Sequence, residues 1–133
     1  MLQKKIEQYK SYAPLLLRLG LAAVFIVHGY NKLSAIANTT EFFASIQIPL
    51  AGFFAWLVAF VEFFGGILVA IGLYTRIAAA LIAVIMIMAM FLVKFAQGFV
   101  GGWEFDFTLF MVALALILLG SGDLSFGKYL ESR

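Results

Sequence analysis

Residues 50–95 read LAGFFAWLVAFVEFFGGILVAIGLYTRIAAALIAVIMIMAMFLVKF, and this stretch decides the fold. Only three of its residues are charged. A helix that crosses the roughly 30 Å hydrocarbon core of a bilayer needs about 20 mostly apolar residues. The stretch therefore predicts two membrane-spanning helices, over 50–74 and 77–95. The short connection at 74–76 predicts that these two helices form an antiparallel hairpin.

Two further apolar windows of spanning length lie on either side, at 14–30 and 103–119. Across the 133 residues, 65% are hydrophobic and 12% are charged, which is far from the balance of a soluble domain. The sequence predicts an all-α protein, an integral membrane four-helix transmembrane bundle. Residues 1–13 are predicted to be a leader, 14–120 the transmembrane domain and 121–133 a C-terminal tail.

The distribution of cations predicts the orientation in the membrane, because short cytoplasmic loops carry an excess of Lys and Arg. One side, which holds both termini and the second loop, carries Lys4, Lys5, Lys10, Arg76, Lys128 and Arg133. The opposite side carries only Lys32 and Lys94. Both termini are therefore predicted to be cytoplasmic. The net charge of +2 is scattered, so no basic face for nucleic acid is expected.

The one long connection, residues 31–49, contains Thr39-Thr40-Glu41-Phe42-Phe43-Ala44-Ser45-Ile46. This segment predicts a short amphipathic helix that lies in the membrane interface as a lid.

The chain contains no Cys and a single His. These counts exclude a disulfide framework, a thiol nucleophile, an iron–sulfur cluster and covalent haem attachment. One His cannot complete a closed zinc site, and two-His haem ligation would need a second subunit. We therefore expect no metal and no haem.

Charged side chains within an apolar span cost about 2.5–3.5 kcal/mol each on insertion scales, so Arg18 and Glu62 need an explanation. Arg18 lies twelve residues before Tyr30, and Glu62 lies twelve residues after Leu50. On antiparallel helices these spacings predict similar depths, and hence a buried Arg18–Glu62 pair. The pair either sets the helix register or orients the polar head of a ligand.

A polar cluster is predicted at the outer side, formed by His28, Lys32, Lys94 and Glu104 beneath the lid, with Trp103 as a further contributor. Asp106 is expected to face the other way, towards solvent. A polar end with apolar walls suits a flat amphipathic ligand such as a quinone. His28 is either a ligand contact that exchanges protons or a packed interfacial residue.

Three stretches resemble the DoxX family, and the resemblance covers about Leu15 to Phe126. They are Arg18-Leu19-Gly20 with Phe25-Ile26-Val27-His28-Gly29-Tyr30-Asn31-Lys32-Leu33, Glu62 with Gly65-Gly66 and Gly72-Leu73-Tyr74-Thr75-Arg76, and Gly101-Gly102-Trp103-Glu104. The resemblance implies a multi-pass inner-membrane bundle related to DoxD, the membrane subunit of a thiosulfate:quinone oxidoreductase. It also implies a redox or sulfur-handling partner protein.

The leading hypothesis is a quinone-binding membrane subunit that is not catalytic alone. Its candidate head-group residues are Arg18, His28, Lys32, Glu62 and Glu104, with Lys94 and Trp103 nearby on the outer side. Its expected partners are the lipid bilayer and a redox protein. A homo-oligomer of this chain is a further alternative. The alternatives are a non-catalytic anchor or assembly factor and, less favoured, a small-molecule transporter.

Overall fold

The computed structural model describes all residues, 1–133, and its ordered elements are helices throughout. In chain order they are α1 (Leu2–Glu7), η1 (Lys10–Tyr12), α2 (Ala13–Ser34), α3 (Ile36–Ser45), α4 (Ala51–Ile71), α5 (Thr75–Ala89), η2 (Met90–Lys94), η3 (Phe95–Gln97), η4 (Phe99–Trp103), α6 (Glu104–Leu119) and α7 (Phe126–Glu131). Four helical runs are long and apolar enough to cross a membrane, namely Lys10–Ser34, Ala51–Ile71, Thr75–Gln97 and Phe99–Leu119. The predicted all-α membrane fold with four spans is confirmed.

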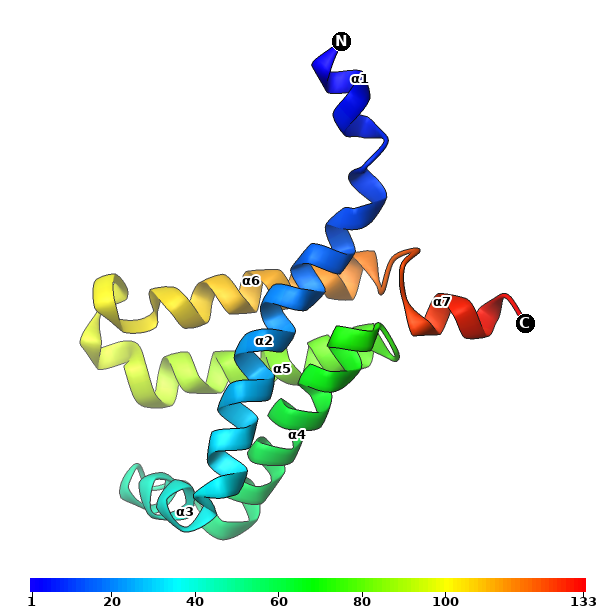
Figure 1. Cartoon of the computed structure of the whole chain (residues 1–133). Helices are drawn as coiled ribbons and strands as arrows, with labels where there is room; N and C mark the ends of the chain where they lie inside the picture. Colours follow the sequence, from blue (N-terminus) through cyan, green and yellow to red (C-terminus); the bar gives the residue numbers. More distant parts are fainter.

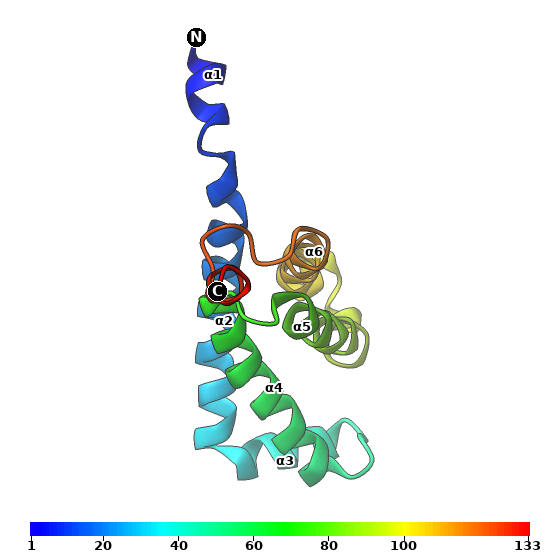
Figure 2. The ribbon, with the colours of Figure 1, turned by 90° about the vertical axis from the view of Figure 1, so that its right-hand side faces the viewer.

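The four spans are arranged as two antiparallel hairpins. Helix α2 packs along α4, and α5 packs along α6, while the contacts between the hairpins are fewer. Figure 1 shows the α5–α6 hairpin crossing the α2–α4 hairpin steeply, and Figure 2 shows α5 and α6 nearly end-on while α2 runs vertically.

The predicted hairpin of the second and third spans is therefore only partly right. Helices α4 and α5 are joined by a tight turn at Gly72–Tyr74, but they diverge from it. A lipid-facing apolar groove of about 260 Å³ separates them, lined in part by Phe60 and Phe64. The closer packing of α4 is with α2.

The spans have two ends that carry different features. We call the end with Ala13, Ile71, Thr75 and Leu119 the terminal end, because the N-terminal and C-terminal segments leave the bundle there. The opposite end, with Ser34 and α3, is the distal end. Helix α1 projects away from the bundle in both views (Figures 1 and 2).

Glycines allow α2 and α4 to approach closely. A Cβ added to Gly29 would lie 2.4 Å from the backbone nitrogen of Phe63, and one added to Gly66 would lie 2.9 Å from a side-chain carbon of Ile26. Small residues at such contacts let helix backbones come together, which is how helices associate in lipid. The two contacts fix the register of α2 against α4.

A core of twelve buried side chains joins the two hairpins, drawn from α2, α4, α5 and α6: Leu21, Ala22, Phe25, Val69, Ala78, Ala79, Ile82, Ala83, Met86, Leu109, Ala113 and Leu116. Alanine is the commonest residue in this set. The small side chains bring the helices close, and most of the larger apolar residues face outwards to lipid.

The predicted short helix in the long connection is confirmed as α3. It packs mainly against α4, and its Phe43 side chain is buried whereas Phe42 is exposed. One face of α3 therefore covers the distal end of the first hairpin. Thr40 reaches the start of α4, where its methyl group lies 3.8 Å from the position of a Cβ on Gly52.

Candidate functional site

The distal end of the first hairpin holds a buried ion pair between Lys32 of α2 and Glu62 of α4. Lys32 Nζ donates to Glu62 Oε2 at 2.7 Å. The Glu62 side chain is 4% exposed, and the Lys32 side chain is 26% exposed. The pair therefore presents part of an ammonium group at the protein surface with a carboxylate behind it.

His28 lies one helical turn before Lys32 on α2, and its side chain is exposed at the protein surface. The imidazole lies near the Glu62 carboxylate. An imidazole beside a lysine–carboxylate pair can donate or accept a hydrogen bond and can exchange protons near neutral pH. Of the candidate head-group residues, the structure brings together His28, Lys32 and Glu62.

Arg18 is not part of this group, and the predicted Arg18–Glu62 pair is wrong. Arg18 is 2% exposed and lies at the terminal end, where its guanidinium donates only to main-chain carbonyls. Its acceptors are the oxygens of Val69 at 2.9 Å, Ala70 at 2.8 Å, Ser121 at 2.7 Å and Leu124 at 2.8 Å. The side chain thus caps the C-terminal end of α4 and fastens the segment after α6 to it.

The physical reason for this error is the register of the first hairpin. The prediction placed Tyr30, as the end of the first span, at the same depth as Leu50, as the start of the second. Instead α2 continues to Ser34, and Gly29 faces Phe63, so α4 begins well beyond the end of α2, where α3 packs against it. Glu62 consequently comes level with the distal end of α2, far from Arg18.

The second hairpin holds a separate ion pair at its own distal end. Lys94 Nζ lies 3.3 Å from both carboxylate oxygens of Asp106, but only Oδ1 is aligned to accept a hydrogen bond. The Asp106 side chain is 7% exposed. The expectation that Asp106 is merely solvated is therefore wrong.

Glu104 has a different role from the one expected. Its Oε1 accepts a hydrogen bond from the Gly101 amide at 3.1 Å, within the bent segment that starts the fourth span. Gly101 has φ +75°, which favours glycine. Trp103 packs edge-on against Phe99 and Phe107 in the same region. Glu104 and Trp103 therefore shape this turn, apart from His28 and Lys32.

The predicted single outer cluster is thus divided between the hairpins. The segment 90–103 packs against α5 and α6, whereas α3 packs against α4 and α2, and Figure 1 shows these two distal ends apart. Each hairpin repeats one arrangement. In each, a Lys near the distal end of the first helix pairs with a carboxylate of the second helix. In each, an Arg near the terminal end also donates to the C-terminal end of the second helix. Arg18 reaches the carbonyls of Val69 and Ala70, and Arg76 reaches the carbonyl of Leu118.

Asp106 is the residue that reasoning from the sequence missed, although a signal was present. The buried residues of α6 are Asp106, Leu109, Ala113 and Leu116, which follow steps of three, four and three. That spacing marks one helix face. The carboxylate therefore belonged to the inward face, and Glu104, two residues earlier, did not.

No group of three or more His, Asp or Glu side chains is placed to hold a metal ion. The spans hold two lysine–carboxylate pairs, Lys32–Glu62 and Lys94–Asp106. Of these, the Lys32–Glu62 pair is the one with an exposed histidine beside it.

The chain is similar to two known bacterial proteins. The chain is 39% identical over 115 residues to "Putative oxidoreductase CatD" of Bacillus subtilis, which covers 86% of this chain and 84% of that relative. It is 29% identical over 134 residues to "Inner membrane protein YqjF" of Escherichia coli, with 98% of each chain covered. No solved structure matches the chain significantly.

The four apolar spans together with the inner-membrane relative support the predicted location, a multi-pass protein of the inner membrane. The sequence model of the DoxX family matches residues 13–95, which include all of the first hairpin and its Lys32–Glu62 pair. The match takes in more than half of the chain, and the CatD relative covers still more of it. The chain belongs to the DoxX family.

Proposed function

We propose that this chain is the quinone-binding subunit of an inner-membrane oxidoreductase system, and that electrons reach the quinone from a redox partner protein. The observation that carries the proposal is the Lys32–Glu62 pair, which presents an ammonium group beside the exposed His28 at the distal end. The name of CatD supports a redox role for the system.

The residues at this site fit the polar head of a quinone. An ammonium has three N–H donors, and Lys32 uses one of them on Glu62, so the others can donate to a carbonyl oxygen. His28 offers a second donor on the adjoining face of α2. Exposed apolar side chains of the same region, among them Val27 and Phe42, provide a surface for the isoprenoid tail.

A bound quinone supplies reversible chemistry of two electrons and two protons. In this proposal Lys32 would hold one carbonyl oxygen of the quinone and His28 would hold the other, and His28 would carry protons between water and the quinone. Glu62 holds the ammonium of Lys32 in place from behind. The chain has no Cys with which to hold an iron–sulfur cluster, so the electron carrier is assigned to the partner protein.

The test is the quinone content of the purified protein. The chain is extracted in mild detergent, and its bound small molecules are quantified by mass spectrometry. Wild type is expected to carry quinone near one equivalent, and Lys32→Met and His28→Ala are each expected to lose most of it. Lys94→Met is the matched control, because it removes a lysine from the equivalent ion pair of the other hairpin.

The Lys94→Met control is expected to retain the quinone of wild type. Equal loss in Lys32→Met and Lys94→Met would show that ion pairs act through stability alone. A folded wild type free of quinone would overturn the proposal.

A second candidate function is a non-catalytic anchor or assembly factor. It is favoured because the charged groups within the spans find their partners inside the chain. Arg18 donates only to carbonyl oxygens, and Lys32 and Lys94 each pair with a carboxylate. In that case the charges serve only to fix helix pairing. Quinone-free wild type that still co-purifies with a redox protein would support this function over the first.

A further inference from the structure

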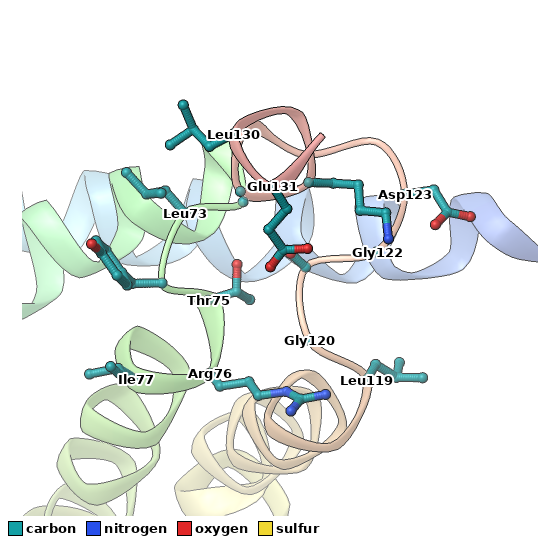
Figure 3. A pocket seen from close by; sticks show the side chains of 15 residues that line it. Leu73, Thr75, Arg76, Ile77, Leu119, Gly120, Gly122, Asp123, Leu130 and Glu131 are labelled. Carbon is teal, nitrogen blue, oxygen red and sulfur yellow. The ribbon is translucent and has the colours of Figure 1, made fainter. Parts of the chain in front are cut away.

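A large cleft lies at the terminal end, far from the Lys32–Glu62 pair. Its volume is about 770 Å³, and it opens between the turn that joins α4 to α5 and the C-terminal segment that carries α7 (Figure 3). Thr75, the first residue of the third span, and Leu119, the last residue of the fourth, both line it. Because spans end at the membrane surface, the cleft lies at the depth of lipid head groups.

The walls of this cleft are firmly held. The Gly127 amide donates to the carbonyl of Gly72 at 3.0 Å, and a Cβ on Gly127 would lie 2.8 Å from the same oxygen. Arg18 fastens the loop before α7 through its bonds to Ser121 and Leu124. The cleft is therefore a built feature of the fold.

A buried hydroxyl at the base of the cleft has no partner. Thr75 is 3% exposed, and its Oγ1 makes no hydrogen bond. Figure 3 shows this oxygen pointing towards the segment that carries Glu131, beside the Glu131 carboxylate in this view. A buried hydroxyl without a partner is costly, so it points to a ligand that satisfies it.

The N-terminus of α5 opens onto the same space. The first hydrogen bond into α5 runs from the Ala78 amide to the Tyr74 carbonyl, so the amides of the first turn before Ala78 have no acceptor within the helix. Free amides and the helix dipole at such an end favour an anion, most often a phosphate. Together with the Thr75 hydroxyl they form a donor set at the base of the cleft.

Four charged side chains line the cleft, and none of them makes an ion pair. They are two cations and two anions: Arg76, Lys128, Asp123 and Glu131. Figure 3 shows the Arg76 guanidinium lying below the cleft near Leu119 and the Glu131 carboxylate directed into it. A simple anion would contact the cations alone, whereas a ligand with both signs of charge can also contact a carboxylate.

We propose that the cleft binds a phospholipid whose head group carries a phosphate and a primary ammonium. The phosphate lies at the N-terminus of α5, where Thr75 and Arg76 donate to it, and the ammonium lies against Glu131. The acyl chains follow Ile77 and Leu119, which are exposed at the edge of the cleft and face the bilayer. This site does not depend on the proposed quinone site, since the two lie at opposite ends of the spans.

The test is binding of defined lipids to the delipidated full-length chain, measured by native mass spectrometry in detergent. The lipids are phosphatidylethanolamine, phosphatidylcholine and phosphatidylglycerol with identical acyl chains. Phosphatidylethanolamine is expected to bind roughly tenfold or more tightly than the other two. Phosphatidylcholine has no N–H to donate to Glu131, and phosphatidylglycerol has no positive charge.

Three variants assign the contacts. Glu131→Gln is expected to abolish the preference for phosphatidylethanolamine over phosphatidylglycerol. Arg76→Gln and the nearly isosteric Thr75→Val are expected to weaken the binding of all three lipids, because each removes a donor to the phosphate that the lipids share. Lys10→Gln, an exposed cation outside the cleft, is the control and is expected to bind as wild type does.

Equal affinity for the three lipids, or wild-type selectivity in Glu131→Gln, would overturn the proposal. Free phosphoethanolamine that competes at the same concentration as the lipid would identify a soluble ligand in place of the membrane and would overturn it too. Thermal unfolding of each variant without lipid shows whether it is folded. Should Arg76→Gln or Thr75→Val fail to fold, the Glu131→Gln comparison decides, because Glu131 is exposed.

Discussion

Gly29 of α2 lies directly against the backbone of Phe63 of α4, so closely that a Cβ on this glycine would come within 2.4 Å of the Phe63 amide nitrogen. This contact places Glu62 beside Lys32 and sends Arg18 to the far end of the hairpin. The polar contacts of the first hairpin thus depend on one close approach of two backbones.

Replacing Gly29 by Ala is expected to push α2 and α4 apart. Overpacking of this kind costs about 1–3 kcal/mol, and more where backbone has to move, as it does here. Gly20→Ala is the control on the same helix, because a Cβ there would meet nothing within 4 Å. It should be neutral or stabilise the chain by about 0.5–1 kcal/mol. The stability of both variants is measured by thermal unfolding in detergent, followed by circular dichroism. Similar stability changes in the two variants would contradict the register of α2 against α4.

Removing one member of the Lys32–Glu62 pair is expected to lower the free energy of unfolding more than removing both members does. A stranded buried charge costs about 3–5 kcal/mol, and the partial exposure of Lys32 lowers that to about 1–3 kcal/mol. The double variant Lys32→Met, Glu62→Leu should recover much of the loss in Glu62→Leu, since neither charge is left. A double-mutant cycle on unfolding free energies measures the coupling, and strictly additive effects would show that the pair contributes nothing.

Arg18→Lys is expected to release the C-terminal segment from the bundle. The guanidinium reaches four carbonyls, including those of Ser121 and Leu124, with a fork geometry that an ammonium cannot reproduce. Limited proteolysis should cut within 121–133 several times faster than in wild type, while the spans stay intact. Lys10→Gln should not change the cleavage rate, and an unchanged rate in Arg18→Lys would exclude the capping role.

Asp106→Asn is expected to destabilise the second hairpin more than Glu104→Gln does. Asp106 is buried and is the partner of Lys94, whereas Glu104 accepts one hydrogen bond from an amide at the surface. The loss should be about 1–3 kcal/mol for Asp106→Asn and about 0.5–1 kcal/mol for Glu104→Gln. The unfolding free energies of the two variants are measured in detergent. A larger loss in Glu104→Gln would contradict the buried position of Asp106 and favour the sequence-based expectation that Asp106 faces solvent.

The orientation predicted from the cations can be tested with single cysteines, because the chain has none of its own. Ser132→Cys lies in the C-terminal segment, and Asn38→Cys lies on the exposed side of α3. In intact spheroplasts a membrane-impermeant maleimide should label Asn38→Cys, and Ser132→Cys only after permeabilisation. Labelling in the opposite pattern would place both termini outside.

Much of the fold could be predicted without coordinates. Four apolar windows of spanning length predicted the four spans, and the amphipathic segment near Phe42 and Phe43 predicted α3. These features depend on composition and local periodicity, which a sequence carries directly. The crossing of the hairpins could not be predicted in this way, since close approaches such as those at Gly29 and Gly66 depend on which helices meet in space.

Of the candidate site, the sequence by itself determined which residue types lie within the membrane, and that the charges among them would need partners. Only the tertiary structure decided which charges meet: Lys32 with Glu62, Lys94 with Asp106, and Arg18 with main-chain carbonyls. The physical reason is register. Partners across a hairpin depend on where each helix begins and how closely the backbones approach, and a shift of a few turns changes every pair while leaving hydropathy and periodicity the same.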